Sequence, residues 1–301
     1  MNAPGVFPPP LRPGDVVAVV APAGPVHELS LHQGVAVLEA WGLRVRISGS
    51  ITARHGYLAG SDERRAAELA AAFAEPNVRA IWCARGGYGV TRIADAIAEA
   101  VRTAADPKWI VGFSDVTALH RIVRAECNWV TLHATGVEGL GRFGPDAVAS
   151  SSARGVLFGE QEQVRLRGTT IRAGSVDGVI DGGNLAMLAA LCGTRWALDA
   201  VDLLFTEDVN ERPYRIDRLL TQVLDAASVR ALAFGQFTNS GEDLDRHGAF
   251  SVNAVLDERS TLVSGPSVRD LSVGHIEGAN HAVPLGASAR LDDDLLAIAA
   301  R

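Results

Sequence analysis

Residues 108–120 (KWIVGFSDVTALH) place a serine at a turn where its hydroxyl could act as a nucleophile. Residues 109–111 are a short apolar run with β-branched side chains, which predicts a buried strand. Residues 115–124 carry apolar side chains at helical spacing, which predicts a helix. The chain must turn sharply between them. A serine at such a turn projects its hydroxyl beyond the sheet edge, beside unpaired N–H groups that favour a developing anion.

The match to the nucleophile-elbow pattern G-x-S-x-G is partial, because Val116 stands where the second glycine would be. Ser114 or Asp115 could instead cap the helix by accepting hydrogen bonds from its first N–H groups. Helix caps are common and catalytic serines are rare, so these residues alone favour the cap. Partners for a nucleophile must therefore be sought elsewhere in the chain.

A glycine-rich segment, residues 85–89 (RGGYG), follows the predicted strand 78–83. Ligands of open α/β sheets bind beyond the carboxyl ends of the strands, so this segment should meet the Ser114 turn. Paired glycines let backbone N–H groups approach an oxyanion closely. The N–H groups of Gly86, Gly87 and Asp115 thus form a candidate oxyanion hole. The alternatives are a plain tight turn and a phosphate-binding loop, although the G-x-G-x-x-G pattern is incomplete.

A serine nucleophile needs a general base, usually histidine, and a carboxylate that orients this base. The chain has eight histidines, and spacing does not select among them. Among the carboxylates, Glu207 directly follows the apolar run 203–206, so a rigid element would aim its side chain. A surface or helix-start carboxylate is the alternative interpretation of Glu207. No H-E-x-x-H motif is present, which disfavours a zinc hydrolase.

Composition narrows the classes of function. The chain of 301 residues is long enough for one large or two ordinary domains, and its net charge of −7 disfavours a dedicated nucleic-acid binder. Lys108 is the only lysine, so a Schiff-base or pyridoxal enzyme would have to use it, and no P-loop exists. Cys83, Cys127 and Cys192 lie far apart without metal-ligand spacing, which favours reduced thiols.

The N-terminal residues 1–10 lack the basic and apolar regions of a signal peptide, and no apolar run approaches the roughly 18 residues of a membrane span. We therefore expect a cytoplasmic protein with no membrane or nucleic-acid partner, and with no metal or other cofactor.

The first half of the chain alternates strands and helices, which predicts a Rossmann-like, doubly wound parallel sheet over residues 1–160 that carries Ser114. The predicted strands are 15–21, 43–47, 78–83, 109–111 and 129–133, and the predicted helices are 29–41, 61–74, 90–102 and 115–124.

After residue 160 the pattern changes. Residues 161–181 alternate loosely, which predicts antiparallel strands and, over 161–175, a linker. A smaller α+β domain is expected over 176–301, with the site in the cleft between the domains. Its predicted elements are a helix beginning at 182–191, strands 202–206 and 229–234, a helix at 212–224, an acidic loop at 235–248, and then two strands and a helix.

Several motifs carry a family resemblance. They are 11–15 (LRPGD) with 21–24 (APAG), 56–64 (GYLAGSDER), 83–89 (CARGGYG), 111–119 (VGFSDVTAL), 182–185 (GGNL), 207–209 (EDV) with 213–218 (PYRIDR), and 274–275 (GH) before 284–286 (PLG). In this order and spacing the chain resembles the LD-carboxypeptidase family, the muramoyltetrapeptide carboxypeptidases of peptidoglycan recycling.

The resemblance implies a catalytic triad in which Ser114 is the nucleophile, Glu207 the orienting carboxylate and His275 the base. The choice of His275 rests on this resemblance alone. His281 lies six residues further on and is the alternative base, and Glu211 is a second acid near Glu207.

The resemblance also implies a homodimer, with the nucleophile on the first domain and the other two triad residues on the second. Arg85 and Tyr88 of the glycine-rich segment are candidate substrate contacts. Arg85 would bind the substrate carboxylate, or else form a structural ion pair.

The expected activity is hydrolysis of the L,D-amide bond that releases the terminal D-alanine of a murein tetrapeptide. One alternative keeps the triad and changes the substrate to acylated nucleotide conjugates, as in relatives that resemble microcin C immunity peptidases. Another is a non-catalytic two-domain ligand-binding protein, which would bind its ligand without turnover.

Overall fold

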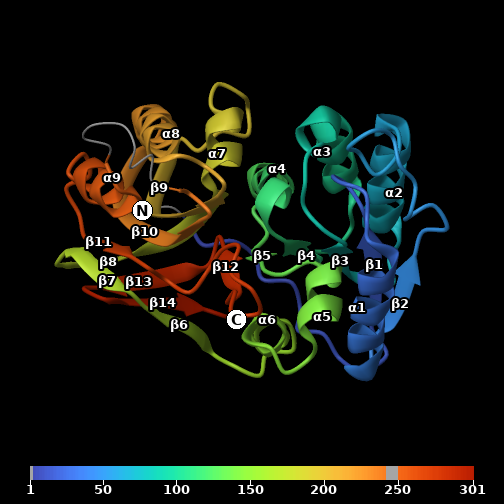
Figure 1. Ribbon diagram of the computed structural model, residues 1–301. Coiled ribbons are helices and arrows are strands. Elements are labelled where there is room, and N and C mark those ends of the chain that lie inside the picture. The colour runs from blue at the N-terminus through green and yellow to red at the C-terminus, as the bar shows by residue number, and fades with distance from the viewer. Residues whose placement is uncertain (1–2, 242–249) are drawn as a thin grey trace.

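The buried apolar runs of the first half form one sheet in the computed structural model, which describes residues 3–241 and 250–301 (Figure 1). Five parallel strands lie in the order β5-β4-β3-β1-β2. They are β1 (Val16–Val20), β2 (Arg44–Ile47), β3 (Val78–Cys83), β4 (Trp109–Gly112) and β5 (Thr131–His133). Each successive pair is joined through a helix, as parallel strands require. The predicted doubly wound parallel sheet is confirmed.

Helices cover both faces of this sheet (Figure 1). Successive side chains of a strand point to opposite faces, so Val17 and Val19 of β1 pack in one core cluster and Ala18 and Val20 in another. The first face carries α1 (Glu28–Ala40), α5 (Val137–Phe143) and α6 (Val148–Leu157), and the second carries α2 (Asp62–Ala74), α3 (Ala94–Thr103) and α4 (Thr117–Cys127).

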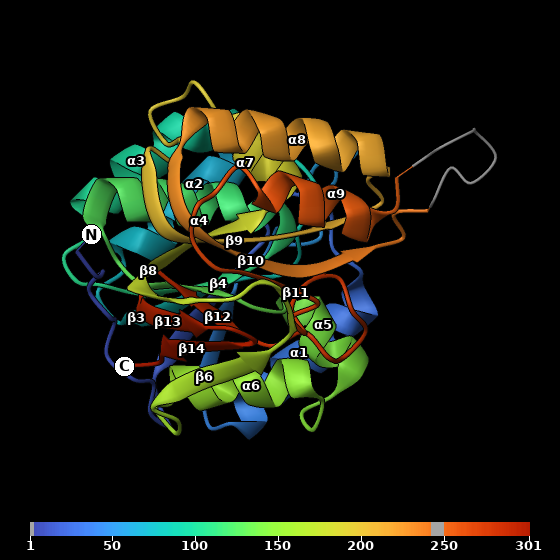
Figure 2. The same ribbon diagram turned by 90° about the vertical axis from the view of Figure 1, so that its left-hand side faces the viewer.

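A second, mixed sheet has the strand order β6-β14-β13-β8-β9-β10-β11-β7. Strands β8 to β11 are parallel to one another, and the outer strands are antiparallel to their neighbours. Figure 2 shows helices α8 and α9 over β9 and β10. The elements are β6 (Gln163–Arg167), β7 (Thr169–Arg172), β8 (Ser175–Asn184), α7 (Leu185–Leu191), β9 (Ala200–Val209), α8 (Pro213–Ala226), β10 (Ser228–Thr238), α9 (Val252–Ser260), β11 (Ser267–Arg269), β13 (Ser288–Asp292) and β14 (Leu295–Ala299).

The two halves of the chain are joined by one strand pairing and by a shared hydrophobic core. Strand β12 (Val283–Leu285), from the C-terminal part of the chain, pairs antiparallel with β5 and so extends the first sheet. One core cluster runs from Trp82 of the first sheet to Phe205, Val273 and Leu291 around the second. Burial of this shared apolar surface holds the two sheets in a fixed relation.

Two expectations for the second half were wrong. Residues 161–175, expected to be a linker, contain β6 and β7, because the alternation in β6 buries Val164 and Leu166 on one face of the strand. The antiparallel strands expected within 161–181 are confirmed, since β6 and β7 are each antiparallel to their neighbours. The helix expected from residue 182 begins only at Leu185, because residues 182–184 end strand β8. The apolar residues after Asn184 do form a helix, but the prediction wrongly included Gly182 and Gly183 in it.

The C-terminal part also differs from the prediction. Glu207 lies within β9 rather than after it, and β10 extends through residues 235–238 of the expected acidic loop. The other part of that loop, at 242–249, lies outside the described residues. Four strands, β11 to β14, follow α9 in the described residues, whereas the sequence predicted two. Short apolar runs such as Val283–Leu285 give little periodic signal, so they were not recognised as strands.

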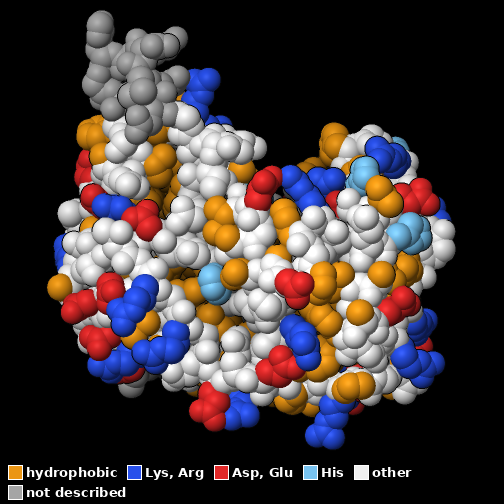
Figure 3. Space-filling model, turned by 60° about the horizontal axis from the view of Figure 1, so that its bottom comes forward, with side chains coloured by type: hydrophobic (Ala, Val, Ile, Leu, Met, Phe, Trp, Pro, Cys, Tyr) orange, Lys and Arg blue, Asp and Glu red, His pale blue; other side chains and the backbone are white. Residues whose placement is uncertain are grey.

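Charged side chains of both signs are interspersed on the face shown in Figure 3. Arg290 on β13 and Asp177 on β8 form an exposed ion pair of 2.7 Å. None of the helices in residues 3–241 and 250–301 has the length and apolar character of a membrane span.

A buried ionic cluster joins helix α4 to strand β8. Asp181 on β8 lies 2.5 Å from the guanidinium of Arg121 and 3.3 Å from that of Arg124, and all three side chains are at least nine-tenths buried. Arg121 also donates hydrogen bonds to the carbonyl oxygens of Trp196 and Ala197. Removal of one partner from such a cluster leaves buried charges without compensation, which is costly.

We therefore predict that Asp181→Ala lowers the free energy of unfolding by about 3–5 kcal/mol, measured by urea denaturation. The matched control is Asp177→Ala, which breaks the exposed pair with Arg290 and should cost at most about 1 kcal/mol. Equal losses in the two variants would contradict a structural role for the buried cluster.

Candidate active site

Ser114 lies at a strained turn between β4 and the short 3-10 helix η2 (Ser114–Val116) that leads into α4. Its φ of 64° is uncommon for a residue other than glycine and costs on the order of 1–3 kcal/mol. The nucleophile elbow has the same feature. Neither η2 nor α4 has a side-chain cap, so the capping role expected as the alternative for Ser114 and Asp115 is absent from these helix starts.

Val116 occupies the position of the second glycine in the elbow pattern. A Cβ atom on Gly112 would lie only 2.8 Å from a methyl carbon of Val116. Gly112 therefore provides the space that the larger side chain needs, and the turn is retained without the second glycine.

The glycine-rich segment after β3 meets the Ser114 turn, as expected. A Cβ atom on Gly86 would lie 2.8 Å from the Cβ and 3.1 Å from the Oγ of Ser114, so only glycine fits here. Gly87, at φ 120°, packs instead against Gly24 in the loop after β1. Within the described part of the chain, the N–H groups of all three candidate donors, Gly86, Gly87 and Asp115, have no hydrogen-bond acceptor.

The Asp115 side chain ties the two loops together. It is buried, and its Oδ2 accepts a hydrogen bond of 3.0 Å from the Val90 N–H, one residue beyond the glycine-rich segment. Burial raises the pKa of Asp115 to about 6, because the charged form is poorly solvated there. The carboxyl group thus fastens the glycine-rich segment to the Ser114 turn.

Glu207 and His275 form a hydrogen-bonded pair. Their side chains meet at 2.8 Å, with the imidazole Nδ1 donating to Oε2 of the carboxylate. Glu207 is fully buried, whereas the His275 side chain retains 21% of its exposure. A carboxylate at Nδ1 fixes the tautomer and leaves the other ring nitrogen, Nε2, to accept a proton.

Two glycines allow this pair to form. A Cβ on Gly274, which has φ 132°, would lie 3.2 Å from the Glu207 carboxylate, and a Cβ on Gly235 would lie 3.1 Å from the Glu207 Cβ. Asn280 accepts a hydrogen bond from the Gly274 N–H and so holds the loop. Of these residues only Gly274 lies in one of the sequence motifs, whereas Gly235 and Asn280 have no local sequence signal for a role in the site.

Phe113 connects the pair to the serine turn. Its ring centroid lies 4.7 Å from that of His275, so the imidazole packs against the residue that precedes Ser114. Behind Phe113 lies the buried imidazole of His133, with ring centroids 5.9 Å apart. Burial keeps the pKa of His133 well below the usual value, so this ring is neutral near pH 7.

The alternative triad residues lie in other surroundings. His281 Nδ1 is 3.0 Å from the carbonyl oxygen of Ser272 and has no carboxylate partner within the described residues. Glu211 forms an ion pair with Arg215 in the first turn of α8. The geometry therefore singles out Glu207 and His275 as the hydrogen-bonded acid and imidazole beside the Ser114 turn.

Asn184 is a residue of the site that the sequence analysis missed. Its backbone N–H donates to the Thr117 hydroxyl at 2.9 Å, and its side-chain amide donates to both Glu207 (3.4 Å) and Asp208 (2.9 Å). The preceding Gly183 lets β8 approach Thr117, because a Cβ there would lie 2.6 Å from the hydroxyl. The G-G-N run at the end of a strand was the available signal.

Asp208 has a structural role beside Glu207. It accepts hydrogen bonds from the N–H groups of Ala186 and Val209, each at 2.8 Å, and so satisfies the start of helix α7. Burial raises the pKa of its carboxyl group to about 6.

The two candidate substrate contacts, Arg85 and Tyr88, flank the glycines that meet the Ser114 turn. Arg85 donates a hydrogen bond of 3.3 Å to the Pro25 carbonyl and lies 4.0 Å from Glu138, with its side chain 45% exposed. Tyr88 is also exposed, and its ring packs against that of Tyr57.

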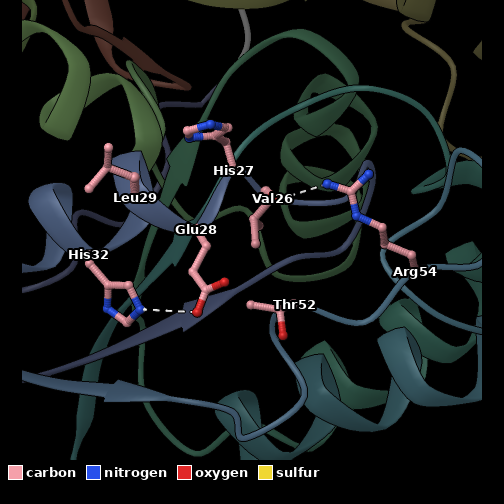
Figure 4. Close-up of a pocket in the computed structure, with 7 residues that line it drawn as sticks. All are labelled: Val26, His27, Glu28, Leu29, His32, Thr52 and Arg54. Carbon is pink, nitrogen blue, oxygen red and sulfur yellow. Dashed lines mark hydrogen bonds and ion pairs between the residues drawn. The ribbon is translucent and has the colours of Figure 1, made fainter.

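A separate pocket of about 660 Å³ borders the loop after β1 (Figure 4). Arg54 donates to the Val26 carbonyl at 3.5 Å, and His32 lies 3.8 Å from Glu28. The pocket contains none of Ser114, Glu207 and His275, so it is distinct from the site built around them. Nowhere in the described ranges do three His, Cys, Asp or Glu side chains gather as metal ligands would.

Comparison with known proteins agrees with this architecture over nearly the whole chain. A putative carboxypeptidase of Streptomyces coelicolor is 42% identical over 94% of this chain and 92% of its own length. The murein tetrapeptide carboxypeptidase of Pseudomonas aeruginosa is 31% identical over 93% of this chain and 94% of its own. The crystal structure of muramoyltetrapeptide carboxypeptidase from Oxalobacter formigenes superimposes with a TM-score of 0.84 at 27% identity, over 94% of this chain and 98% of that one.

Family models match both halves of the chain. The LD-carboxypeptidase N-terminal domain matches residues 17–134, which include the Ser114 turn, and the C-terminal domain matches residues 177–291, which include Glu207 and His275. With relatives above 30% identity across almost its full length, the chain belongs to the LD-carboxypeptidase family.

Proposed function

We propose that this protein is a serine peptidase that hydrolyses the L,D-amide bond of a murein tetrapeptide and releases the terminal D-alanine. The observation that carries the proposal is the 2.8 Å pair between Glu207 and His275, which packs against the strained Ser114 turn through Phe113. The names of the Pseudomonas and Oxalobacter relatives support the substrate. From the family resemblance we also propose a cytoplasmic homodimer.

The chemistry would proceed through an acyl-enzyme. The Ser114 hydroxyl attacks the scissile carbonyl while Nε2 of His275 takes its proton, and buried Glu207 stabilises the imidazolium that forms. His275 then protonates the leaving amine of D-alanine as the C–N bond breaks. Water, deprotonated by the same imidazole, attacks the ester and returns the serine hydroxyl with the shortened peptide.

The tetrahedral oxyanion would rest on backbone N–H groups. Those of Gly86 and Asp115 lie beside Ser114 and have no other acceptor in the described chain. Each such donor typically contributes about 10²–10³ in rate, because it stabilises charge that develops only in the transition state. The Gly87 N–H also has no acceptor in the described chain and is the third proposed donor, on a residue that packs against Gly24 in the loop after β1.

The terminal carboxylate of the substrate needs a cation. Arg85 directly precedes Gly86, and its 4.0 Å separation from Glu138 is long for a strong ion pair. We assign Arg85 to the carboxylate of the departing D-alanine, which would restrict cleavage to the end of the peptide.

The central prediction is that Ser114→Ala lowers D-alanine release from murein tetrapeptide by at least about 10³-fold, measured by amino-acid analysis. The matched control is Ser151→Ala, an exposed serine on α6, which should retain full activity. Activity that survives Ser114→Ala, or that a chelator abolishes, would refute the serine mechanism. Turnover of an acylated nucleotide conjugate in place of the tetrapeptide would favour the immunity-peptidase alternative.

A second prediction separates the two candidate carboxylates. Glu207→Gln should reduce kcat by about 10³–10⁴-fold with little change in KM, because an amide no longer holds the productive imidazole tautomer. Glu211→Gln removes only the half-buried ion pair with Arg215, which is separate from His275, and should keep kcat within about twofold. Steady-state kinetics on the tetrapeptide would show the reverse order if Glu211 were the orienting residue.

A further inference from the structure

Two exposed tyrosines stand together beside the active site. The rings of Tyr57 and Tyr88 lie with centroids 5.8 Å apart, and the residues are 67% and 45% exposed. Among the described residues, this is the aromatic pair in which both rings are open to solvent. Because these rings bury little surface, the pair contributes little to the core and presents apolar faces that a ligand could cover.

Tyr57 is presented by a tight hairpin. His55 and Leu58 exchange both backbone hydrogen bonds, at 2.9 and 3.0 Å, so Gly56 and Tyr57 form a two-residue turn. Gly56 has φ 60°, which the first position of such a turn requires. The turn therefore projects the Tyr57 side chain from the surface instead of folding it into the core.

The loops that carry the two tyrosines are fastened together. Arg65, which is fully buried, donates to the Gly89 carbonyl at 2.8 Å and to the Pro22 carbonyl, and it pairs with Asp62. Arg92 donates to both carboxylate oxygens of Asp62 at 3.0 Å. Asp62 therefore holds two guanidinium groups with one carboxylate, and these contacts fix the segment that carries Tyr88 before any ligand arrives, which lowers the entropy cost of binding.

The ring pair lies within reach of the nucleophile. Gly86 contacts Ser114, and Val90 is hydrogen-bonded to Asp115, so Tyr88 is bracketed by two residues of the site. Two residues span at most about 7 Å, which limits the distance between the Cα atoms of Gly86 and Tyr88. Tyr57 enlarges this surface, because its ring lies beside that of Tyr88.

The chemistry of the surface selects one part of the proposed substrate. The faces are flat, apolar and edged by phenol hydroxyls, and the neighbouring arginines already pair with Asp62. A sugar ring offers an apolar C–H face and hydroxyl edges, which match the flat faces and the phenol hydroxyls of the two rings. In a muramoyl tetrapeptide, three residues separate the sugar from the cleaved bond, and they extend at most about 10 Å.

We propose that Tyr57 and Tyr88 form a saccharide-binding platform that stacks on the sugar of a muramoyl peptide while its far end is cleaved at Ser114. This inference rests on the proposed function and adds a substrate preference to it. The enzyme should bind the glycopeptide more tightly than the free tetrapeptide.

The test is calorimetric binding to Ser114→Ala protein, which separates binding from turnover. Muramoyl tetrapeptide should bind with a Kd about tenfold lower than that of the free tetrapeptide. Adding Tyr57→Ala should abolish this difference without weakening the free tetrapeptide, and Tyr57→Phe should preserve it. Tyr214→Ala is the matched control, because Tyr214 is 59% exposed on α8, away from the two loops.

Equal Kd values for the two ligands, or an equal loss of both in Tyr57→Ala, would overturn the platform. Binding of adenosine monophosphate that Tyr57→Ala abolishes, with no effect on the glycopeptide, would overturn it in favour of a nucleobase site. D-Alanine release from the free tetrapeptide by the wild-type protein is measured separately. Its absence would refute the proposed peptidase, whereas the binding comparison alone decides the platform.

Discussion

The buried carboxylate of Glu207 is the constraint on which the site depends. A charge removed from water is stable only when it is paired and hydrogen-bonded, and His275 and Asn184 supply these partners. Both contacts require close backbone approach, which explains the glycines at 235 and 274, where a Cβ would strike Glu207. A side chain at either position would separate Glu207 from its partners. Glycine at both positions therefore lets Glu207 hold the imidazole of His275 in one orientation.

The joined sheets give this pairing its precision. Ser114 belongs to the first sheet, whereas Glu207 and His275 belong to the part of the chain that forms the second. Strand β12 pairs with β5, and the shared core and the Asp181 cluster fix the two halves relative to each other. A site divided between segments so distant in sequence can then hold its interatomic distances constant to within roughly 0.5 Å, which general-base catalysis needs.

Sequence patterns predicted the parts of the site that local physics determines. The Ser114 turn follows from a strand, a glycine and a helix in succession, and its meeting with Gly86 follows from the common carboxyl edge of parallel strands. His275 has no such signal, because it lies on an irregular loop whose position depends on Asn280 and on the β12–β5 pairing. Asn184 was missed because the apolar helix after it resembled the start of a longer helix.

The strained backbone of Ser114 is held in place by contacts from the neighbouring loops. The left-handed conformation of Ser114 persists because the surrounding contacts determine it: Gly86 packs against its side chain, Val116 fills the space beside Gly112, and Asp115 is anchored to Val90. The same anchor holds the segment that carries Tyr88, so the turn that exposes the nucleophile also fixes one half of the ring pair. A single set of loop contacts therefore couples the reacting hydroxyl to the surface where the remote end of a substrate would bind. Binding energy gained at that end can then orient the scissile bond, and orientation lowers the barrier only when the two surfaces are rigidly connected.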